Sequence, residues 1–597
     1  MTEPSAAGAT PGAGAVAPRN AILAIAVLQG FALYGLHRAV AEQAWPATDL
    51  QWLVPLYLLA GLVPLTAQLL AGHLHKLRLW AILAGLGAGL AYAGWHFGAR
   101  VLQSPAAGRG ADAGLTAYFS HLLPLLLAWL IAMAFLRAWL EADRGSPPYP
   151  RLFSAAWRGK ITLLEACVFT GAFWILLALW AELFHTLEID FFRELFTMPL
   201  FAYPVTAIVF GFALHLIGSV DRLVDVVLAQ ILGLLKWLAP LAGLIVVLFT
   251  LALLPKLPAL LASSERPVSA TWLLWLVACN VLLLNAAYQD GKDAAPYGRW
   301  LSAALRCVPP MLLVIAGVAL YSISVRVASL GLTNGRFWGL FVALAALAYA
   351  LAYSVAALRT GPWLGLMGRA NTVIGVAIAG GLLLTLTPAA SPFRLSAASQ
   401  QQRVLDSTDA KQAGPALAYL HDGLAGYGKR SLEQLARLQD HPESARIRSA
   451  AAAALAGQSA DMEGAAGFER WLSALRVHPA GTSLPPALVD VLRARHEAPD
   501  SAEPSLVRRP LGLWLDMTGE AGSEFLLVSE SGAVYRLLAL REGRWQVVSE
   551  GILRSEQRPA SAIDGAALMR GDFSTQPPLL PGLRIGKDGY TLQPDPP

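Results

Sequence analysis

The hydrophobic pattern of the chain consists of long apolar runs separated by short polar segments over the first two thirds of the sequence. A helix needs about 20 apolar residues to cross the hydrocarbon core of a bilayer. Eleven runs reach that length, and we therefore expect eleven transmembrane helices. The runs cover 21–40, 50–72, 77–99, 117–140, 160–184, 200–218, 235–255, 269–289, 305–327, 335–358 and 368–388.

Two segments within this pattern need separate interpretation. The first run ends in AVA before Glu42, as a signal peptide would, but His37 and Arg38 interrupt the approach to that site. We expect an uncleaved first helix. The segment 220–237 carries its charges on one helical face, which predicts an amphipathic helix lying on the membrane surface.

The pattern changes after Pro388, and no later run is long enough to span a membrane. Short amphipathic helices are expected over 394–476. Alternating apolar residues, interrupted by SESG and REGR, predict four or five strands within 511–590. The fold class is therefore mainly α: a polytopic α-helical membrane bundle followed by a soluble α+β domain, with short helices and then a small antiparallel sheet. We expect a disordered tail (1–18), a transmembrane helical domain (19–389), a soluble helical segment (390–478), a linker (479–510) and a small β-rich domain (511–597).

Composition supports a membrane class, because 56% of the residues are hydrophobic and only 14% are charged, whereas soluble domains have about 25% charged residues. No clustered basic face is visible, so nucleic acid is not an expected partner. The lipid bilayer is the expected environment. The oligomeric state cannot be predicted from the sequence.

Lysine and arginine residues are distributed unevenly among the loops of the predicted bundle. Alternation of eleven spans puts 15 of them on the side of the N-terminus and eight on the other side. Cytoplasmic loops carry the excess of positive residues. This predicts a cytoplasmic N-terminus and, with an odd number of spans, a periplasmic C-terminal domain in a bacterial inner membrane.

Polar side chains within or beside the apolar runs indicate the interior of the bundle, because an amide or ionisable group at membrane depth is costly unless it faces protein, water or a partner. We expect a structural network between helices; a substrate or ion pathway and snorkelling surface residues are the alternatives. The carboxylate of Glu165 should pair with Arg137, Arg306 or Arg369. The predicted cytoplasmic half contains Arg137, Glu165, Asn285, Tyr288, Asp290, Arg306, Arg369 and Asn371.

Glycine spacing predicts close helix packing near the third run. Gly85 with Gly89, and Gly94 with Gly98, have the GxxxG spacing. Small residues at this spacing let two helix backbones approach each other closely. We expect packing rather than chemistry at these positions.

Catalytic and cofactor motifs give no support to an enzyme. GLAGYGKR at 423–430 has the spacing of a phosphate-binding loop, but Arg430 stands where Ser or Thr would bind Mg²⁺ and no buried strand precedes it. Neither HExxH, GxSxG nor SxxK occurs. We expect no catalytic residue, no cofactor and no metal site.

Three segments carry a family resemblance. LLLNAAYQDG, SVRVASLGLTNGRFWG and SPFRLSAASQQQRVL together resemble a bacterial family of polytopic membrane proteins, domain of unknown function 4153. The most specific element is GLT-x-x-R, formed by Gly331, Leu332, Thr333 and Arg336, with Thr333 expected as the N-cap of the next span. The resemblance implies a multi-span bacterial membrane protein and no particular activity.

Three functional hypotheses follow. The first is a non-enzymatic inner-membrane protein of envelope assembly or maintenance, whose extracytoplasmic domain binds an envelope protein partner. The second is a transporter with a polar pathway through the cytoplasmic half, for which inverted repeats and broken helices would be expected. The third is a membrane enzyme acting on lipid or glycan.

Overall fold

The chain divides into two compact units, Met1–Leu455 and Ala456–Pro597, in a computed structural model. The predicted soluble helical segment 390–478 is therefore distributed over both units, and the predicted disordered tail 1–18 lies outside the described residues. The structure describes 19–102, 111–142, 147–219, 221–262, 269–291, 296–359, 363–407, 410–456, 468, 471–497, 510–515, 524–529, 534–541, 543–552, 569–570, 583–585 and 588–590.

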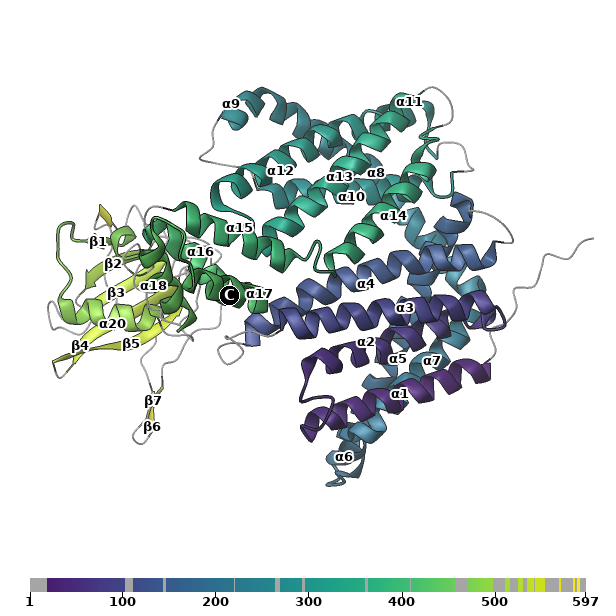
Figure 1. The fold of residues 1–597 in the computed structure, drawn as a ribbon, viewed down its shortest axis with the longest axis horizontal. Coiled ribbons are helices and arrows are strands. Elements are labelled where there is room, and N and C mark those ends of the chain that lie inside the picture. The colour runs from purple at the N-terminus through teal and green to yellow at the C-terminus, as the bar shows by residue number, and fades with distance from the viewer. Residues whose placement is uncertain are drawn as a thin grey trace, which may run out of the picture. The chain divides into compact units, whose positions relative to one another are not determined.

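Eleven helices in the described part of the first unit are long and apolar enough to cross a membrane, which confirms the expected number and supports an integral membrane protein. Figure 1 shows α1, α2 and α3 side by side. The long helices are α1 (Arg19–Ala41), α2 (Leu50–Leu69), α3 (Leu77–His96), α4 (Ala111–Glu141), α5 (Tyr149–His185), α7 (Pro199–Ser219), α8 (Asp221–Leu253), α10 (Ala270–Tyr288), α12 (Val308–Leu330), α13 (Asn334–Leu358) and α14 (Met367–Thr385).

Short helical turns extend or connect several of the long helices. Three candidate spans, 77–101, 224–259 and 299–330, each combine a long helix with such a turn. The turns and short helices are η1 (Ala71–His73), η2 (Phe97–Val101), α6 (Phe191–Thr197), η3 (Leu254–Lys256), α9 (Leu257–Ala262) and α11 (Arg299–Leu305), of which η2 is a π-helix.

Helix α8 differs from the prediction for 220–237. Instead of a separate surface helix, the segment continues into the next span as one helix of 33 residues. Pro240 lies inside α8 and has no N–H to donate to the carbonyl of Lys236, four residues earlier. The hydroxyl of Tyr297 donates to that carbonyl oxygen at 2.5 Å. The side chain thus supplies the hydrogen bond that proline removes from this carbonyl.

The glycines of α3 and η2 pack as predicted at one of the two GxxxG pairs. A Cβ atom on Gly94 would lie 2.7 Å from the Cα of Pro55, and one on Gly98 would lie 2.2 Å from the carbonyl oxygen of Leu50. The backbone of α2 therefore approaches α3 closely only because both residues lack a side chain. Gly85 and Gly89 have no atom within 4 Å of such a Cβ, so this pair has no comparable contact.

Four helices after the last span belong to the same unit: α15 (Pro392–Asp406), α16 (Ala410–Asp422), α17 (Ala425–Ala436) and α18 (Ser444–Leu455). Their buried side chains, including Val404, Leu420, Leu432 and Ile447, form one core with Phe97 and Val101 of η2. The four helices confirm the short helices expected over the first part of 394–476. These helices are thus packed on the end of the third span.

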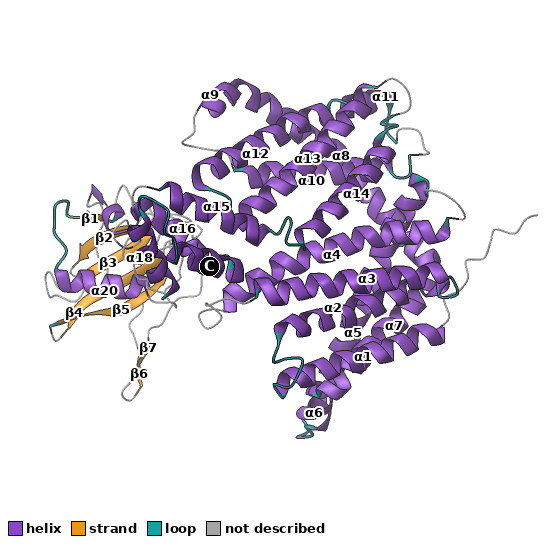
Figure 2. Ribbon diagram, viewed as in Figure 1, coloured by secondary structure: helices purple, strands orange, loops and turns teal. Residues whose placement is uncertain are grey.

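The second unit contains a five-stranded sheet with the order β1-β2-β3-β4-β5. Strands β2 to β5 are antiparallel, as expected, but β1 pairs in parallel with β2, so the sheet is mixed. Figure 2 shows its strands in orange. The strands are β1 (Arg476–His478), β2 (Pro510–Leu515), β3 (Glu524–Ser529), β4 (Val534–Arg541) and β5 (Arg544–Ile552), and β6 (Leu583–Ile585) and β7 (Asp588–Tyr590) form a separate hairpin.

Helix α20 (Pro486–Glu497) lies inside the range 479–510 that the sequence predicted as a linker. Leu488 and Leu492 are one helical turn apart, and both are buried in a core shared with Phe525 and Trp545 of the sheet. The second unit therefore has a core of its own, to which a segment with the composition of a linker contributes a helix.

Candidate functional site

Two asparagines of the predicted polar cluster, Asn285 on α10 and Asn371 on α14, meet in the structure. The Asn371 side chain donates from Nδ2 to Oδ1 of Asn285 at 2.6 Å. Tyr353 on α13 accepts from Nδ2 of Asn285 at 2.6 Å and donates to Oδ1 of Asn371 at 2.5 Å. These three side chains close a ring of hydrogen bonds. Together with Tyr149 of α5, which accepts from Nδ2 of Asn371 at 2.8 Å, we term them the amide–tyrosine network.

The amide groups of the network are fully used within the protein. Asn285 also donates to the carbonyl oxygen of Val281 at 2.9 Å, so each amide makes two donor contacts and one acceptor contact. Tyr353 has no exposed surface. Three cavities in the described part of the chain are lined by other residues. This saturation is what a structural network in a membrane requires, since unpaired polar groups there are costly.

Tyr288 and Asp290, which the sequence placed in the same cluster, lie beside the network. The ring centroids of Tyr288 and Tyr149 are 6.0 Å apart. The carboxylate of Asp290 interacts electrostatically with both phenols. Tyr149 also packs against Gly368, where a Cβ atom would lie 2.8 Å from the tyrosine ring. Four of the predicted cluster residues therefore lie together at one end of the bundle: Asn285, Tyr288, Asp290 and Asn371.

The remaining residues of the predicted cluster are dispersed. Arg137 on α4 forms an ion pair with Glu141 at 3.1 Å, one turn along its own helix. Arg369 is exposed, and Arg306 is half-buried between α11 and α12. Glu165 on α5 is half-buried and forms no ion pair with any residue that the structure describes. The structure does not bring Glu165 to any of the three arginines expected as its partner.

The GLT-x-x-R element forms the loop between α12 and α13 and the first turn of α13. Thr333 is the N-cap, as predicted, and its hydroxyl accepts from the backbone N–H of Arg336 at 3.3 Å. The Arg336 side chain reaches back to the carbonyl oxygens of Leu330 and Gly331, at 3.0 and 2.7 Å. The element is thus a helix start in which the side chains of Thr333 and Arg336 satisfy backbone groups of the turn.

Helices α15 and α16 bind the backbone of this loop, 330–334, and we term this set of contacts the clamp. Ser399 accepts from the N–H of Leu332 at 2.9 Å, and Gln400 donates to the Leu332 carbonyl at 2.8 Å. Arg403 donates to the carbonyl oxygen of Leu330 at 2.6 Å. The hydroxyl of Tyr419 accepts from the N–H of Asn334 at 2.8 Å.

Burial of the clamp is reflected in the pKa of Tyr419. Desolvation raises the pKa of this phenol, and it outweighs the hydrogen bond from Asn334 and the positive charge of Arg336, which both lower it. The neutral hydroxyl is therefore the form that the clamp holds. A further contact, from Nδ2 of Asn334 to the Ser120 hydroxyl at 2.9 Å, connects the loop to α4.

Alternation of the eleven spans puts the two hydrogen-bonded sets at opposite ends of the bundle. Tyr149 starts the fifth span, Asn285 lies near the end of the eighth and Asn371 near the start of the eleventh. Ser120 starts the fourth span, and the loop 330–334 joins the ninth and tenth. The side-chain contacts connect only positions that alternation puts on the same side, and so they support the span order independently of hydropathy.

Sequence reasoning missed most of the residues that build these two sets. Tyr353 lies in an apolar run and was not selected, although its hydroxyl needs a partner at membrane depth. Tyr149 lies in the polar segment before the predicted run 160–184, so it was not considered for the interior of the bundle. Ser399, Gln400 and Arg403 lie in the run SQQQR, which carried part of the family resemblance but no predicted contact. A polar run directly after a span was the available signal.

Comparison of the chain with protein-family models, curated proteins and solved structures found no match.

Proposed function

We propose that this chain is a non-enzymatic scaffold of the bacterial inner membrane that takes part in envelope assembly or maintenance. In this proposal the second unit, 456–597, is a periplasmic module that binds an envelope protein partner. The observation that carries it is the clamp, in which helices directly after the last span fix the loop 330–334. Membership of the domain of unknown function 4153 family is part of the same proposal and rests on Gly331, Leu332, Thr333 and Arg336.

The clamp supports this role because it anchors the helices after the last span to the membrane helices. Three backbone groups of the loop, at Leu332 and Asn334, bind side chains of α15 and α16. The same helices bury apolar side chains against Phe97. A scaffold needs such an anchored segment, and the second unit follows it along the chain.

The amide–tyrosine network also favours a scaffold over a transporter. Every amide N–H of its two asparagines is bonded to a protein group, whereas a transport pathway needs polar groups that exchange partners with water or substrate. The alternative rests on the convergence of polar side chains from four helices. If it holds, Asp290→Asn, beside the network, should abolish function in cells while protein abundance stays at the wild-type level.

Reporter fusions test the compartment on which the proposal depends. We expect alkaline phosphatase fused after Pro597 to be active, and a fluorescent protein that folds only in the cytoplasm to be dark there. The matched fusion after Gly291, on the predicted cytoplasmic side, should give the opposite pair of results. A fluorescent fusion after Pro597 would refute the periplasmic placement.

Site-specific photocrosslinking tests the partner. β5 is an edge strand of the sheet, and Val548 on it is partly exposed, so a photoreactive residue at this position should capture an envelope protein in living cells. The control carries the same residue at Arg193, which is exposed on α6 on the same predicted side of the membrane. One reproducible adduct at Val548 and none at Arg193 supports the proposal. No adduct at Val548 contradicts partner binding through this sheet edge.

A further inference from the structure

Three arginines converge on the hydroxyl of Tyr427 at the end of the third span. Arg100 belongs to η2, Arg394 to the first turn of α15 and Arg430 to α17. The charges of all three act on the Tyr427 hydroxyl. Those of Arg100 and Arg430 also act on His96. The Arg430 guanidinium lies over the Tyr427 ring, 5.3 Å from its centroid. Separate elements therefore bring three positive charges to one place.

The two polar groups at the centre of these arginines carry no negative charge. His96 contacts the carbonyl oxygen of Leu386 through Nδ1 at 2.8 Å, and because a carbonyl only accepts, this nitrogen carries a proton. In the neutral imidazole, Nε2 accepts from the Tyr427 hydroxyl at 2.9 Å. Burial raises the pKa of Tyr427, so the phenol stays protonated at neutral pH. Neither group balances the charge of the arginines.

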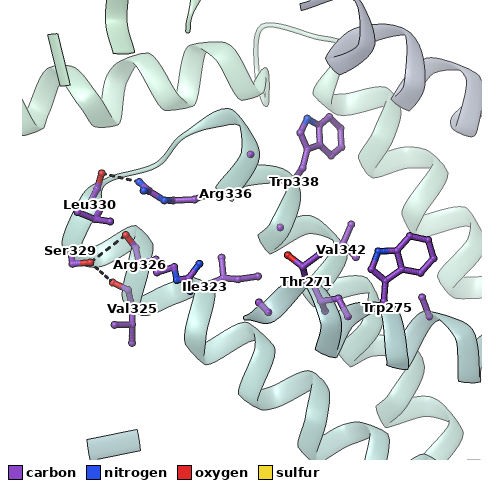
Figure 3. A pocket seen from close by; sticks show the side chains of 15 residues that line it. Thr271, Trp275, Ile323, Val325, Arg326, Ser329, Leu330, Arg336, Trp338 and Val342 are labelled. Carbon is purple, nitrogen blue, oxygen red and sulfur yellow. Dashed lines mark hydrogen bonds between the residues drawn. The ribbon is translucent and has the colours of Figure 1, made fainter. Parts of the chain in front are cut away.

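The guanidinium groups have no anionic partner in the described part of the chain. Arg100 and Arg430 form no hydrogen bond or ion pair with any residue that the structure describes. Arg394 donates to the carbonyl oxygen of Ala389 at 2.8 Å, which is an uncharged acceptor. Arg336, on the same predicted side of the membrane, instead donates to two carbonyl oxygens, and Figure 3 shows one of these bonds. Because like charges repel one another, an anion beside the three converging arginines would stabilise them.

Exposed aromatic side chains adjoin the arginines on the surface of α3. Tyr92 and Trp95 are 47% and 37% exposed, and their ring centroids are 6.4 Å apart. Tyr92 lies close enough to Tyr427 to interact with it electrostatically. Trp and Tyr are enriched where a membrane helix passes from hydrocarbon to headgroups. The third span ends at Val101, directly after Arg100, so these charges lie at the depth of lipid headgroups.

We infer that this surface binds the headgroup of an anionic glycerophospholipid from the membrane leaflet at that end of the third span. The lipid phosphate accepts hydrogen bonds from the guanidinium groups, whose several N–H donors match phosphate oxygens. The rings of Tyr92 and Trp95 lie against the ester region and the first part of an acyl chain. A soluble anion would use the arginines alone. We term the surface the arginine–aromatic surface, and it consists of Tyr92, Trp95, Arg100, Arg394 and Arg430.

Native mass spectrometry of the full chain in detergent tests this surface. We expect phosphatidylglycerol to bind more tightly than phosphatidylcholine with the same acyl chains. Arg100→Gln should weaken binding of the first phosphatidylglycerol about fivefold, the equivalent of about 1 kcal/mol for one basic residue at an anionic membrane surface. The matched control, Arg193→Gln, removes the same charge from an exposed position on α6, on the same predicted side of the membrane, and should leave affinity unchanged.

Thermal unfolding distinguishes loss of lipid binding from loss of the fold. Without added lipid, Arg100→Gln should unfold at the temperature of wild type, because Arg100 makes no hydrogen bond or ion pair with a described residue. Added phosphatidylglycerol should raise the unfolding temperature of wild type and of Arg193→Gln more than that of Arg100→Gln. The reason is that a ligand stabilises the folded state in proportion to its affinity for that state.

A second pair of variants tests the aromatic part of the surface without changing charge. Trp95→Leu should weaken binding of phosphatidylglycerol, whereas Trp272→Leu changes an exposed tryptophan of α10 on the same predicted side and should not. Unchanged binding by Trp95→Leu, or displacement by glycerol 1-phosphate at the same concentration as the lipid, would overturn the assignment to a lipid. Equal affinity for the two lipids, or equal binding by Arg100→Gln and wild type, would overturn the anion site itself. The inference does not depend on the proposed scaffold role.

Discussion

At the scale of single residues, Tyr353 determines whether the polar groups of the membrane part are satisfied. Its hydroxyl is the only atom of the ring of hydrogen bonds that accepts from one asparagine and donates to the other. Because Tyr353 is fully buried, no water can replace it without a rearrangement of α10, α13 and α14.

We predict that Tyr353→Phe lowers the free energy of unfolding by about 1–2 kcal/mol, because a buried amide donor and a buried acceptor both lose a partner. Thermal unfolding in detergent measures the effect. Tyr92→Phe is the control, since Tyr92 is exposed and keeps its ring contact with Trp95 as phenylalanine. Equal stability of the two variants would show that the ring of hydrogen bonds contributes nothing measurable.

Tyr419 gives a prediction for the dependence of stability on pH. Burial raises its pKa in the folded protein above the usual value of about 10. The stabilisation is therefore fully present below pH 10 and is lost as the pH rises through the folded pKa. Between these values the stability of wild type should fall more steeply with pH than that of Tyr419→Phe. Parallel curves in a pH series of thermal unfolding would contradict this assignment.

Single residues also show how much of the candidate site could be predicted from the sequence. Asn285 and Asn371 could be selected because an amide in an apolar run needs a partner, and the structure joins them. Glu165 met the same criterion, yet it makes no ion pair in the described structure. The free-energy cost of a polar group in the membrane predicts that the group needs a favourable environment. It does not predict whether a protein partner, the lipid headgroups or protonation of the group provides that environment.

At the scale of elements, the connection between α12 and α13 depends on one glycine. Gly331 has φ of +72°, and a Cβ atom there would lie 2.7 Å from Cδ of Arg403 and 2.8 Å from Nε2 of Gln400. Both the backbone conformation and the approach of α15 therefore require glycine.

We predict that Gly331→Ala lowers the free energy of unfolding by at least about 1–2 kcal/mol, the cost of a left-handed conformation with a Cβ atom. The contact with α15 adds to this cost. Gly335→Ala is the matched control, because Gly335 is in α13, four residues later, and has open space around its Cβ position. Thermal unfolding should show a loss for Gly331→Ala alone. A similar loss in both variants would mean that the clamp needs no close approach at Gly331.

The elements themselves were largely predictable, whereas their contacts were not. All eleven spans follow from apolar length, because lipid imposes that length on each helix separately. The continuity of α8 from Asp221 into the predicted span 235–255 was not predicted, because the charges of 220–237 favoured a separate surface helix. The hydrogen bond from Tyr297 to the Lys236 carbonyl joins residues 61 positions apart and was not predicted either. Such contacts depend on which helices become neighbours, and hydropathy contains no information about that.

At the scale of the whole molecule, the boundary between the compact units lies between Leu455 and Ala456 rather than at the change of composition near 390. The polar run after Pro388 suggested a separate domain because it cannot enter lipid. It nevertheless packs on the membrane helices, since its polar side chains bind the loop 330–334 and its apolar ones cover Phe97 and Val101.

Two truncated chains test whether the stable membrane unit ends near 390 or at Leu455. A chain ending at Leu455 keeps the clamp, so its membrane unit should unfold at the temperature of the full chain. A chain ending at Ala390 loses it and should be less stable by several kcal/mol. Exposure of Phe97 and Val101 would cost about 2 kcal/mol each, which exceeds the roughly 1 kcal/mol for each lost hydrogen bond.

Size-exclusion chromatography and thermal unfolding in one detergent measure both truncations beside the full chain. Because water and detergent headgroups can replace hydrogen bonds at a helix end, the apolar contacts with η2 should dominate the difference. Phe97→Ala in the chain ending at Leu455 checks this, since it removes the contact while α15 to α18 remain. If the chain ending at Ala390 were as stable as the one ending at Leu455, the helices after the last span would contribute nothing to the stability of the membrane helices.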